Sequence, residues 1–169
     1  MHDKFPFGRY AGHSSAVIGL KDYQWLIWIS NKGIQRTDLR KDTERVRFAL
    51  NNFTPKGTCL HCKAPAQKLS IATSQGKAMV EDIYVFCDKE RCWSSYGLEP
   101  SNQLIRPICF DSMLEFSQGG GREPKYALKS MQTTLNELAG ITGKITEKRA
   151  QQFIDDLIEQ EHAAGKVYV

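Results

Sequence analysis

Two short cysteine-bearing stretches, Cys59-Leu60-His61-Cys62 and Cys87-Asp88-Lys89-Glu90-Arg91-Cys92, are separated by 24 residues. Two close pairs of thiols on either side of a hairpin are typical of a structural zinc site, because each pair can supply one edge of a tetrahedron of ligands. Four thiolates leave no coordination position for water, so such a site stabilises the fold and does no catalysis. We therefore predict one structural Zn²⁺, bound by Cys59, Cys62, Cys87 and Cys92. The alternative is chance clustering or buried free thiols, since four residues rather than the commoner two separate the second pair.

The segment between the two cysteine pairs predicts the hairpin. Residues 67–73 are expected to form one strand, and residues 78–87, rich in β-branched and aromatic side chains, the other. We assign residues 57–117 to a zinc-binding module of the zinc-ribbon or treble-clef type. His61 is expected to be exposed, where it can contact a partner, and Cys109 to be a buried small hydrophobe.

Residues 1–56 are expected to form a small module of strand, turn and helix. Glycines punctuate a short aromatic stretch near its start, which predicts a strand and a tight turn. Asp22 is expected to cap one helix, and Thr37 or Asp38 to cap a second helix that ends before Pro55.

The last third of the chain predicts a helical hairpin. Residues 118–123 form a glycine-rich linker, and residues 124–169 carry two apolar stripes at helical spacing. These stripes are Leu128, Met131, Leu135 and Leu138, then Ala150, Phe153, Ile154, Leu157 and Ile158. Thr146 is expected to begin the second helix. The narrow apolar faces need a partner, which is either the rest of this chain or another protein, and the fold class as a whole is α+β.

Composition restricts the kind of protein. The apolar fraction is 41% and the charged fraction 25%, which favours a packed core over disorder. The longest apolar run, residues 25–29, is far shorter than the ~20 residues of a membrane span. The N-terminal stretch has no hydrophobic run of the signal-peptide type, and the cysteine count of five is odd. We therefore expect a cytoplasmic protein with no membrane partner and no disulfide framework.

Catalytic patterns are missing from the sequence. No two of the four histidines have the spacing of a helix-borne metal site, and no G-x-S-x-G motif occurs. The carboxylates do not form a recognisable set that would hold two cations in a nuclease. We therefore predict that the protein is not an enzyme, with a nuclease accessory or a nuclease as the least favoured alternative.

Positive charge is concentrated at the start of the chain. The net charge is +4, but residues 1–58 hold ten basic and five acidic side chains, whereas the rest of the chain has a slight acidic excess. In the second expected helix, Arg36, Arg40 and Arg47 lie near one face, with Lys41 and Arg45 on an adjacent stripe. This asymmetry favours a surface that faces a polyanion, and the alternative is an ordinary solvated basic face.

The same region carries a family resemblance. The residues Phe7-Gly8-Arg9-Tyr10-Ala11-Gly12, followed by Ile18 and by Asp22-Tyr23-Gln24-Trp25-Leu26, resemble the small module found at the C-terminus of exodeoxyribonuclease X-like proteins and in free-standing bacterial and phage proteins. The resemblance covers about residues 5–50 and implies a compact unit that accompanies DNA-processing proteins. It does not imply nuclease activity, because in those exonucleases the chemistry lies in a separate domain. The overall architecture, a small basic zinc protein with a helical tail, also resembles the large-subunit-like zinc protein of type IV CRISPR effector complexes.

These observations predict a non-catalytic nucleic-acid-binding subunit of a prokaryotic or phage nucleoprotein complex, with DNA as the expected nucleic acid and other protein subunits as partners. One alternative is a subunit of a CRISPR effector complex that contacts target DNA next to the guide. Another is a protein-interaction adaptor whose loop is stapled by zinc. The expected nucleic-acid contacts are Arg9, Tyr10, Lys32, Arg36, Arg40, Lys41, Arg45, Arg47 and Arg122.

Overall fold

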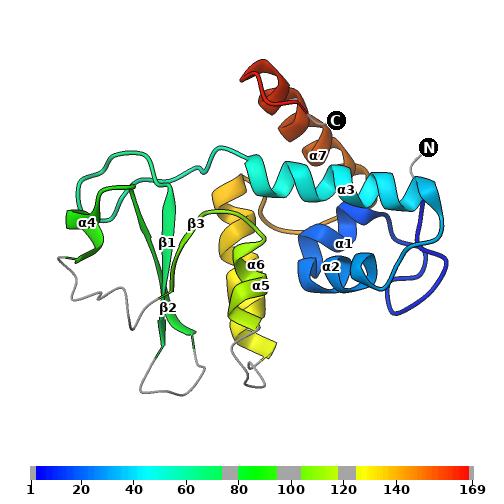
Figure 1. The fold of residues 1–169 in the computed structure, drawn as a ribbon, viewed down its shortest axis with the longest axis horizontal. Coiled ribbons are helices and arrows are strands. Elements are labelled where there is room, and N and C mark those ends of the chain that lie inside the picture. The colour runs from blue at the N-terminus through cyan, green and yellow to red at the C-terminus, as the bar shows by residue number, and fades with distance from the viewer. Residues whose placement is uncertain (1–2, 74–79, 95–103, 118–124, 168–169) are drawn as a thin grey trace. The chain divides into compact units, whose positions relative to one another are not determined.

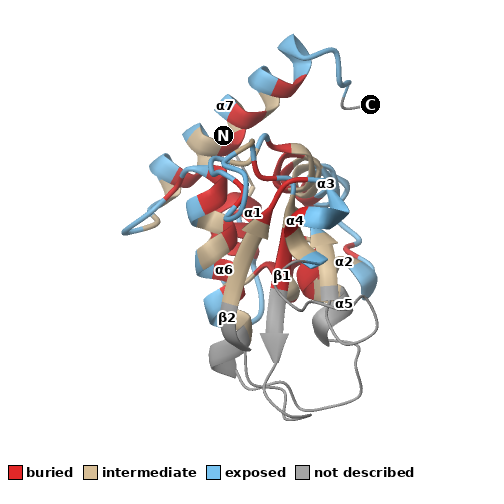
Figure 2. Cartoon of the chain, turned by 90° about the vertical axis from the view of Figure 1, so that its left-hand side faces the viewer, coloured by how far each residue is buried: buried red, intermediate tan, exposed pale blue. Residues whose placement is uncertain are grey.

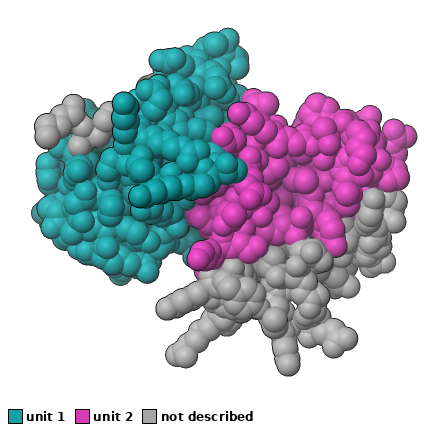
Figure 3. Space-filling model, turned by 180° about the vertical axis from the view of Figure 1, so that it is seen from behind, with its two compact units in different colours: residues 1–53, 141–169 teal, residues 54–140 magenta. Residues whose placement is uncertain are grey.

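A computed structural model describes residues 3–73, 80–94, 104–117 and 125–167. Its helices and small antiparallel sheet confirm the α+β class (Figure 1). The chain divides into two compact units, coloured separately in Figure 3. Unit 1 comprises residues 1–53 and 141–169, and unit 2 comprises residues 54–140.

Unit 1 is helical. Its helices are α1 (Ser15–Lys21), α2 (Tyr23–Asn31), α3 (Thr37–Asn52) and α7 (Glu147–Ala163). Helix α7 packs against α1 and α3, although almost a hundred residues separate it from α3 in the sequence. Buried positions follow one side of α7, red in Figure 2, at the helical spacing of Ala150, Ile154 and Leu157.

The close packing of α1 on α3 depends on a glycine. A Cβ atom at Gly19 of α1 would lie 2.9 Å from Cγ1 of Val46 and 3.1 Å from Cδ1 of Leu50. Both of those side chains belong to α3 and are fully buried. The missing side chain therefore allows the two helices to approach each other and bury their apolar faces.

The helix starts follow the sequence in part. The carboxylate of Asp22 accepts a hydrogen bond from the backbone N–H of Trp25 at 3.1 Å, which confirms the predicted cap of α2. Helix α1, which precedes that cap, was not predicted. The expected cap of α3 by Thr37 or Asp38 is wrong, because the helix already begins at Thr37 and the preceding Arg36 makes no side-chain capping bond.

The N-terminal aromatic stretch is a closed loop, so the prediction of a strand there is wrong. Lys4 and Ser14 form an isolated bridge, the N–H of Phe5 donates to the carbonyl of His13, and the N–H of Gly12 donates to the carbonyl of Phe5. The chain doubles back within ten residues and satisfies these backbone groups internally, which leaves no extended edge to pair with a sheet.

Unit 2 contains the sheet. Its strands β1 (Lys68–Thr73), β2 (Val80–Phe86) and β3 (Leu104–Pro107) are antiparallel in the order β2-β1-β3. The pairing of β1 with β2 confirms the two strands of the predicted hairpin, whose turn lies outside the described residues. Strand β3 was not predicted. The helices of this unit are α4 (Glu90–Ser94), α5 (Ser112–Ser117) and α6 (Lys125–Ala139).

The two C-terminal helices exist as expected, and Thr146 caps α7 through the N–H of Arg149. They do not share a unit, however. Helix α6 packs on β2 and α5 through buried residues that include Met131 and Leu135, whereas α7 belongs to unit 1. The expected hairpin of residues 124–169 is therefore divided between the two units, because an apolar stripe needs burial but does not specify which surface buries it. The predicted linker, residues 118–123, lies outside the described residues.

Candidate metal centre and cationic surface

The first cysteine pair lies in a tight knuckle, residues 59–64, just before β1. The N–H of Cys59 donates to the carbonyl of Ala64 at 2.6 Å, and the N–H of Lys63 donates back to the carbonyl of Cys59 at 3.0 Å. Lys63 has a left-handed backbone, with φ of 62°, which is strained for a residue with a side chain. These bonds hold the chain in a turn that directs both thiols to the same side.

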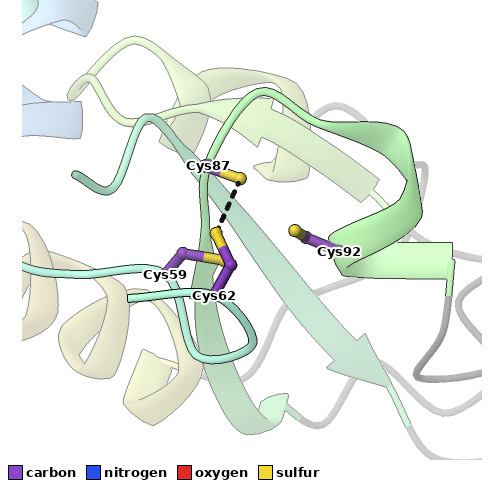
Figure 4. A group of neighbouring side chains, drawn as sticks. All are labelled: Cys59, Cys62, Cys87 and Cys92. Atoms are coloured by element: carbon purple, nitrogen blue, oxygen red, sulfur yellow. Dashed lines mark hydrogen bonds between the residues drawn. The ribbon is translucent and has the colours of Figure 1, made fainter. Parts of the chain in front are cut away.

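The second pair comes from the end of β2 and from α4. Cys87 directly follows β2, and Cys92 lies within α4, whose short turn is closed by the bond from the N–H of Cys92 to the carbonyl of Lys89. The N–H of Leu60 donates to the carbonyl of Val85 at 2.9 Å and so ties the knuckle to β2. Figure 4 shows the four thiols directed toward a common point.

The geometry suits a metal ion. The four sulfur atoms of Cys59, Cys62, Cys87 and Cys92 all lie within 4.8 Å of one another, and the sulfurs of Cys62 and Cys87 are 3.7 Å apart. A tetrahedron of thiolates with metal–sulfur bonds of about 2.3 Å has edges of about 3.8 Å. All four are free thiols in the structure. The predicted ligand set is therefore brought together and can hold a metal ion.

The surroundings of the four thiols favour unequal ionisation. Burial alone would raise the pKa of Cys59, but backbone N–H groups of Cys62, Cys87 and His61 stabilise the thiolate and lower that pKa to about 6. Burial and hydrogen bonds to the neighbouring thiols raise the pKa of Cys92 to about 12. A second buried negative charge beside the first is costly, and a divalent cation between the sulfurs removes that cost.

The knuckle end of unit 2 has a small core made largely of these cysteines. Cys59, Cys87 and Cys92 are buried together with Phe86, and Ala64, Tyr84 and Trp93 pack against them. Cys62 is exposed. His61 is also exposed, as predicted, and is not one of the four ligands. Cys109 is half-buried rather than buried as predicted, and its sulfur lies 3.4 Å from the Ser112 hydroxyl oxygen.

Some of the predicted nucleic-acid contacts are engaged inside unit 1. Arg45 is only 19% exposed and binds Asp42 of its own helix and Asp155 of α7, with the second contact at 2.5 Å. Arg36 binds Asp3 at 3.3 Å. Arg45 therefore joins α3 to α7, and its guanidinium is less available to a ligand than the spacing of basic residues along the helix indicated.

Other predicted cations remain at the surface of unit 1. Lys32 and Arg40 are exposed, and neither has a carboxylate partner among the described residues. Lys41 is exposed and Arg47 is half-buried. Arg122 lies outside the described residues.

Arg9 and Tyr10 share one acidic partner. The Nη2 atom of Arg9 lies 2.6 Å from a carboxylate oxygen of Asp22, and the hydroxyl of Tyr10 donates to the same oxygen at 2.9 Å. Burial, followed by this hydrogen bond and the charge of Asp22, raises the pKa of Tyr10 to about 12. Tyr10 also packs edge-on against Trp25, with ring centroids 5.1 Å apart, so its ring has a structural role in the loop.

The two tryptophans of α2 differ in exposure. Trp25 is buried, but Trp28, one turn later in α2, is 53% exposed. The sequence signal that could have identified it is Lys32, four residues later at the C-terminal cap of α2, since a cation at this spacing lies beside the ring on the surface of a helix.

Comparisons with protein-family models, curated proteins and solved structures found no match to this chain. Within the described residues, no helix has the length and apolar character that crossing a membrane requires. The cysteine group and the surface of unit 1 are therefore the features that can indicate a function.

Proposed function

We propose that the protein is a non-catalytic nucleic-acid-binding subunit of a prokaryotic or phage nucleoprotein complex, and that its cysteine group binds a structural Zn²⁺. The observation that carries the first part is the exposure of Lys32 and Arg40 without carboxylate partners among the described residues. They belong to a unit with thirteen basic and ten acidic side chains. Exposed cations that are not neutralised by a carboxylate are available to phosphates.

The choice of zinc follows from the donor atoms. Four cysteine sulfurs at tetrahedral spacing suit Zn²⁺ or an iron centre, and a mononuclear site with all four positions filled by protein is typical of structural zinc. The ion would supply folding free energy to unit 2 and leave no open position for substrate. The filled coordination shell supports a purely structural role for the ion.

Arg9 adds a third phosphate contact to this proposal. Its side chain is 62% exposed, and only Nη2 is bound to Asp22, so the remaining guanidinium N–H groups can reach a ligand. The resemblance of this stretch to a module that accompanies DNA-processing proteins agrees with such a role.

The proposal predicts salt-dependent binding that depends on two side chains. The double variant Lys32→Glu/Arg40→Glu should lose at least about tenfold in affinity for nucleic acid at low salt, because two phosphate contacts become repulsive. The dependence of log affinity on log salt concentration should become shallower by about two. Fluorescence anisotropy on single-stranded DNA, duplex DNA, RNA and an RNA–DNA hybrid measures both effects, and a preference for the hybrid would favour the CRISPR alternative.

The matched control is Lys144→Glu/Lys148→Glu, which makes the same change of charge at two other exposed positions of unit 1. If the two double variants lose affinity equally, net charge rather than the proposed contacts determines binding. Unchanged affinity of the first variant would contradict the proposal.

A protein-interaction adaptor is the second candidate, and the exposed apolar side chain of Leu60 at the tip of the knuckle favours it. In that case no nucleic acid should bind at low salt. The same anisotropy titration therefore separates the two functions.

A further inference from the structure

Five aromatic residues of unit 1 form one connected group, called here the aromatic cluster: Phe5, Phe7, Tyr10, Trp25 and Trp28. The Trp25 ring contacts three others, with centroid distances of 5.6 Å to Phe5, 5.1 Å to Tyr10 and 6.5 Å to Trp28. The Phe7 ring packs edge-on against Phe5 at 5.9 Å. The ring contacts therefore join the N-terminal loop to α2, beside the bonds of Arg9 and Tyr10 to Asp22.

Two members of the aromatic cluster are at the surface. Phe7 is 43% exposed and Trp28 is 53% exposed, whereas Phe5 is completely buried. Among the described residues, the only other large apolar side chains with comparable exposure are Leu60 and Val167. Exposing two large rings that contact one buried core has a free-energy cost in water, and a ligand with flat apolar faces would offset it.

The backbone holds this arrangement rigidly. Gly8 has φ of 76°, and a Cβ atom there would lie 2.8 Å from Cζ2 of Trp25, so the loop packs directly on the indole. The two hydrogen bonds between Phe5 and the His13 and Gly12 backbone close the loop behind it. The exposed rings are therefore preorganised, which lowers the entropic cost of binding.

Cations lie beside two rings of the aromatic cluster, the exposed Trp28 and the half-buried Tyr10. The Nζ atom of Lys32 lies 5.7 Å from the centroid of the Trp28 ring, and the Cζ atom of Arg9 lies 5.3 Å from that of Tyr10. The carboxylate of Asp22 lies beside Arg9 and Tyr10. Its oxygens already accept hydrogen bonds from Arg9, from the Tyr10 hydroxyl and from the N–H of Trp25. The edge of the aromatic cluster thus presents rings and cations, the combination that binds bases and phosphates.

We propose that Trp28 and Phe7 stack on the bases of a single-stranded nucleic acid, while Lys32 and Arg9 bind its neighbouring phosphates. This rests on the proposed nucleic-acid function and specifies its ligand. The faces of the bases are accessible in a single strand but are covered by neighbouring bases in a duplex, so a protruding ring discriminates between the two. Stacking is tolerant of sequence, so discrimination among bases should be weak.

The test compares three polymers with the full-length protein: oligothymidine, an abasic oligonucleotide of the same length and charge, and a duplex. Wild-type protein should bind oligothymidine about tenfold more tightly than the abasic strand, because only the former offers bases for stacking. Trp28→Ala should remove most of that difference, and Trp28→Phe, which keeps a ring, should restore much of it. Phe7→Ala should independently reduce the same difference in affinity between oligothymidine and the abasic strand.

The control variant is Leu60→Ala, which removes a comparably exposed apolar side chain from unit 2 and should change nothing. Equal affinity of the wild type for oligothymidine and the abasic strand overturns the stacking proposal, as does wild-type affinity of both Trp28→Ala and Phe7→Ala. In those outcomes binding through phosphates persists and the proposed function stands. If the protein binds none of the three polymers at low salt, the proposed function itself is contradicted.

Discussion

The two units of this protein are stabilised in different ways. Unit 1 buries an extended apolar core contributed by its four helices and by Phe5 of the loop. The knuckle end of unit 2 buries a cluster of four residues, of which Cys59, Cys87 and Cys92 are candidate metal ligands. Thiols are small, so this end has little apolar area to bury, and the proposed metal ion would supply stabilisation that packing does not. One chain thus combines a unit with an extended apolar core and a unit that carries a candidate metal centre.

The largest expected effect that separates the two units is removal of the metal. Structural zinc in small domains contributes an apparent binding free energy of about 10–16 kcal/mol, which becomes folding free energy. Chelation, or the substitution Cys92→Ser, should therefore unfold the knuckle, the α4 turn and the adjoining part of the hairpin. Hydrogen exchange followed by mass spectrometry should show lost protection there, while α1, α3 and α7 keep theirs.

The control for this prediction is Cys109→Ser, because Cys109 lies outside the group of four. That variant should keep its metal and its exchange protection. Elemental analysis of the purified protein should give one zinc per chain, and iron or no metal would contradict the assignment. Equal loss of protection in both units would show that they do not fold independently.

A smaller effect should be confined to unit 1. Gly8→Ala forces a Cβ atom against Trp25 and also places a side chain at φ of 76°, whereas Gly12→Ala has the same backbone strain, at φ of 85°, with no atom within 4 Å. Left-handed strain costs about 1–2 kcal/mol, and the overpacking at Gly8 adds about 1–3 kcal/mol. Thermal unfolding should therefore show Gly8→Ala as the less stable variant, with the metal content of unit 2 unchanged in both. Equal stability of the two variants would mean that the loop moves away from the indole at little cost.

The smallest effect concerns acid stability. Burial raises the pKa of Glu147, but bonds from the Ser14 hydroxyl and from His13, together with the Ser14 N–H and the charge of Lys4, outweigh burial and hold that pKa below 4.5. A carboxyl group with a lowered folded-state pKa stabilises the protein above its unfolded pKa, and this contribution is lost as the pH falls through the folded pKa. The side chain is 36% exposed, so the contribution should be below about 1 kcal/mol.

In Glu147→Gln, the free energy of unfolding of unit 1 should therefore fall less steeply between about pH 5 and pH 3 than in the wild type. Chemical unfolding at a series of pH values measures this difference. Unit 2 should still lose stability in acid, since protonation of the thiols would release the proposed metal ion. An unchanged acid profile of unit 1 would show that the bonds of Glu147 to the loop contribute nothing to stability.

Several features were predictable because they depend on neighbouring residues. The spacing of the cysteines identified all four members of the group, and strand composition located β1 and β2. The caps at Asp22 and Thr146 were also identified from local chemistry. Helix α1 was missed because its residues are buried almost all round and so carry no amphipathic pattern, and β3 because it is four residues long.

The role of the basic residues was only partly predictable. The sequence grouped Arg45 with the other cations of α3, yet its guanidinium binds Asp155, 110 residues away. Trp28 is exposed beside Lys32, whereas Trp25, in the same helix, is buried. Ion pairs and burial are formed between segments, so the sequence of one helix does not determine which of its charges remain unpaired.

The sequence by itself determined that this chain has a four-cysteine group, a hairpin between its pairs, amphipathic helices and a basic first third. Each of these is a matter of spacing and composition over a few residues. Only the tertiary structure decided that α6 joins the sheet, that α7 joins α1 and α3, and that rings and cations remain exposed together around Trp25. The physical reason is that the hydrophobic effect has no direction: an apolar stripe is stabilised by any complementary surface, and the choice among surfaces is made when the whole chain packs.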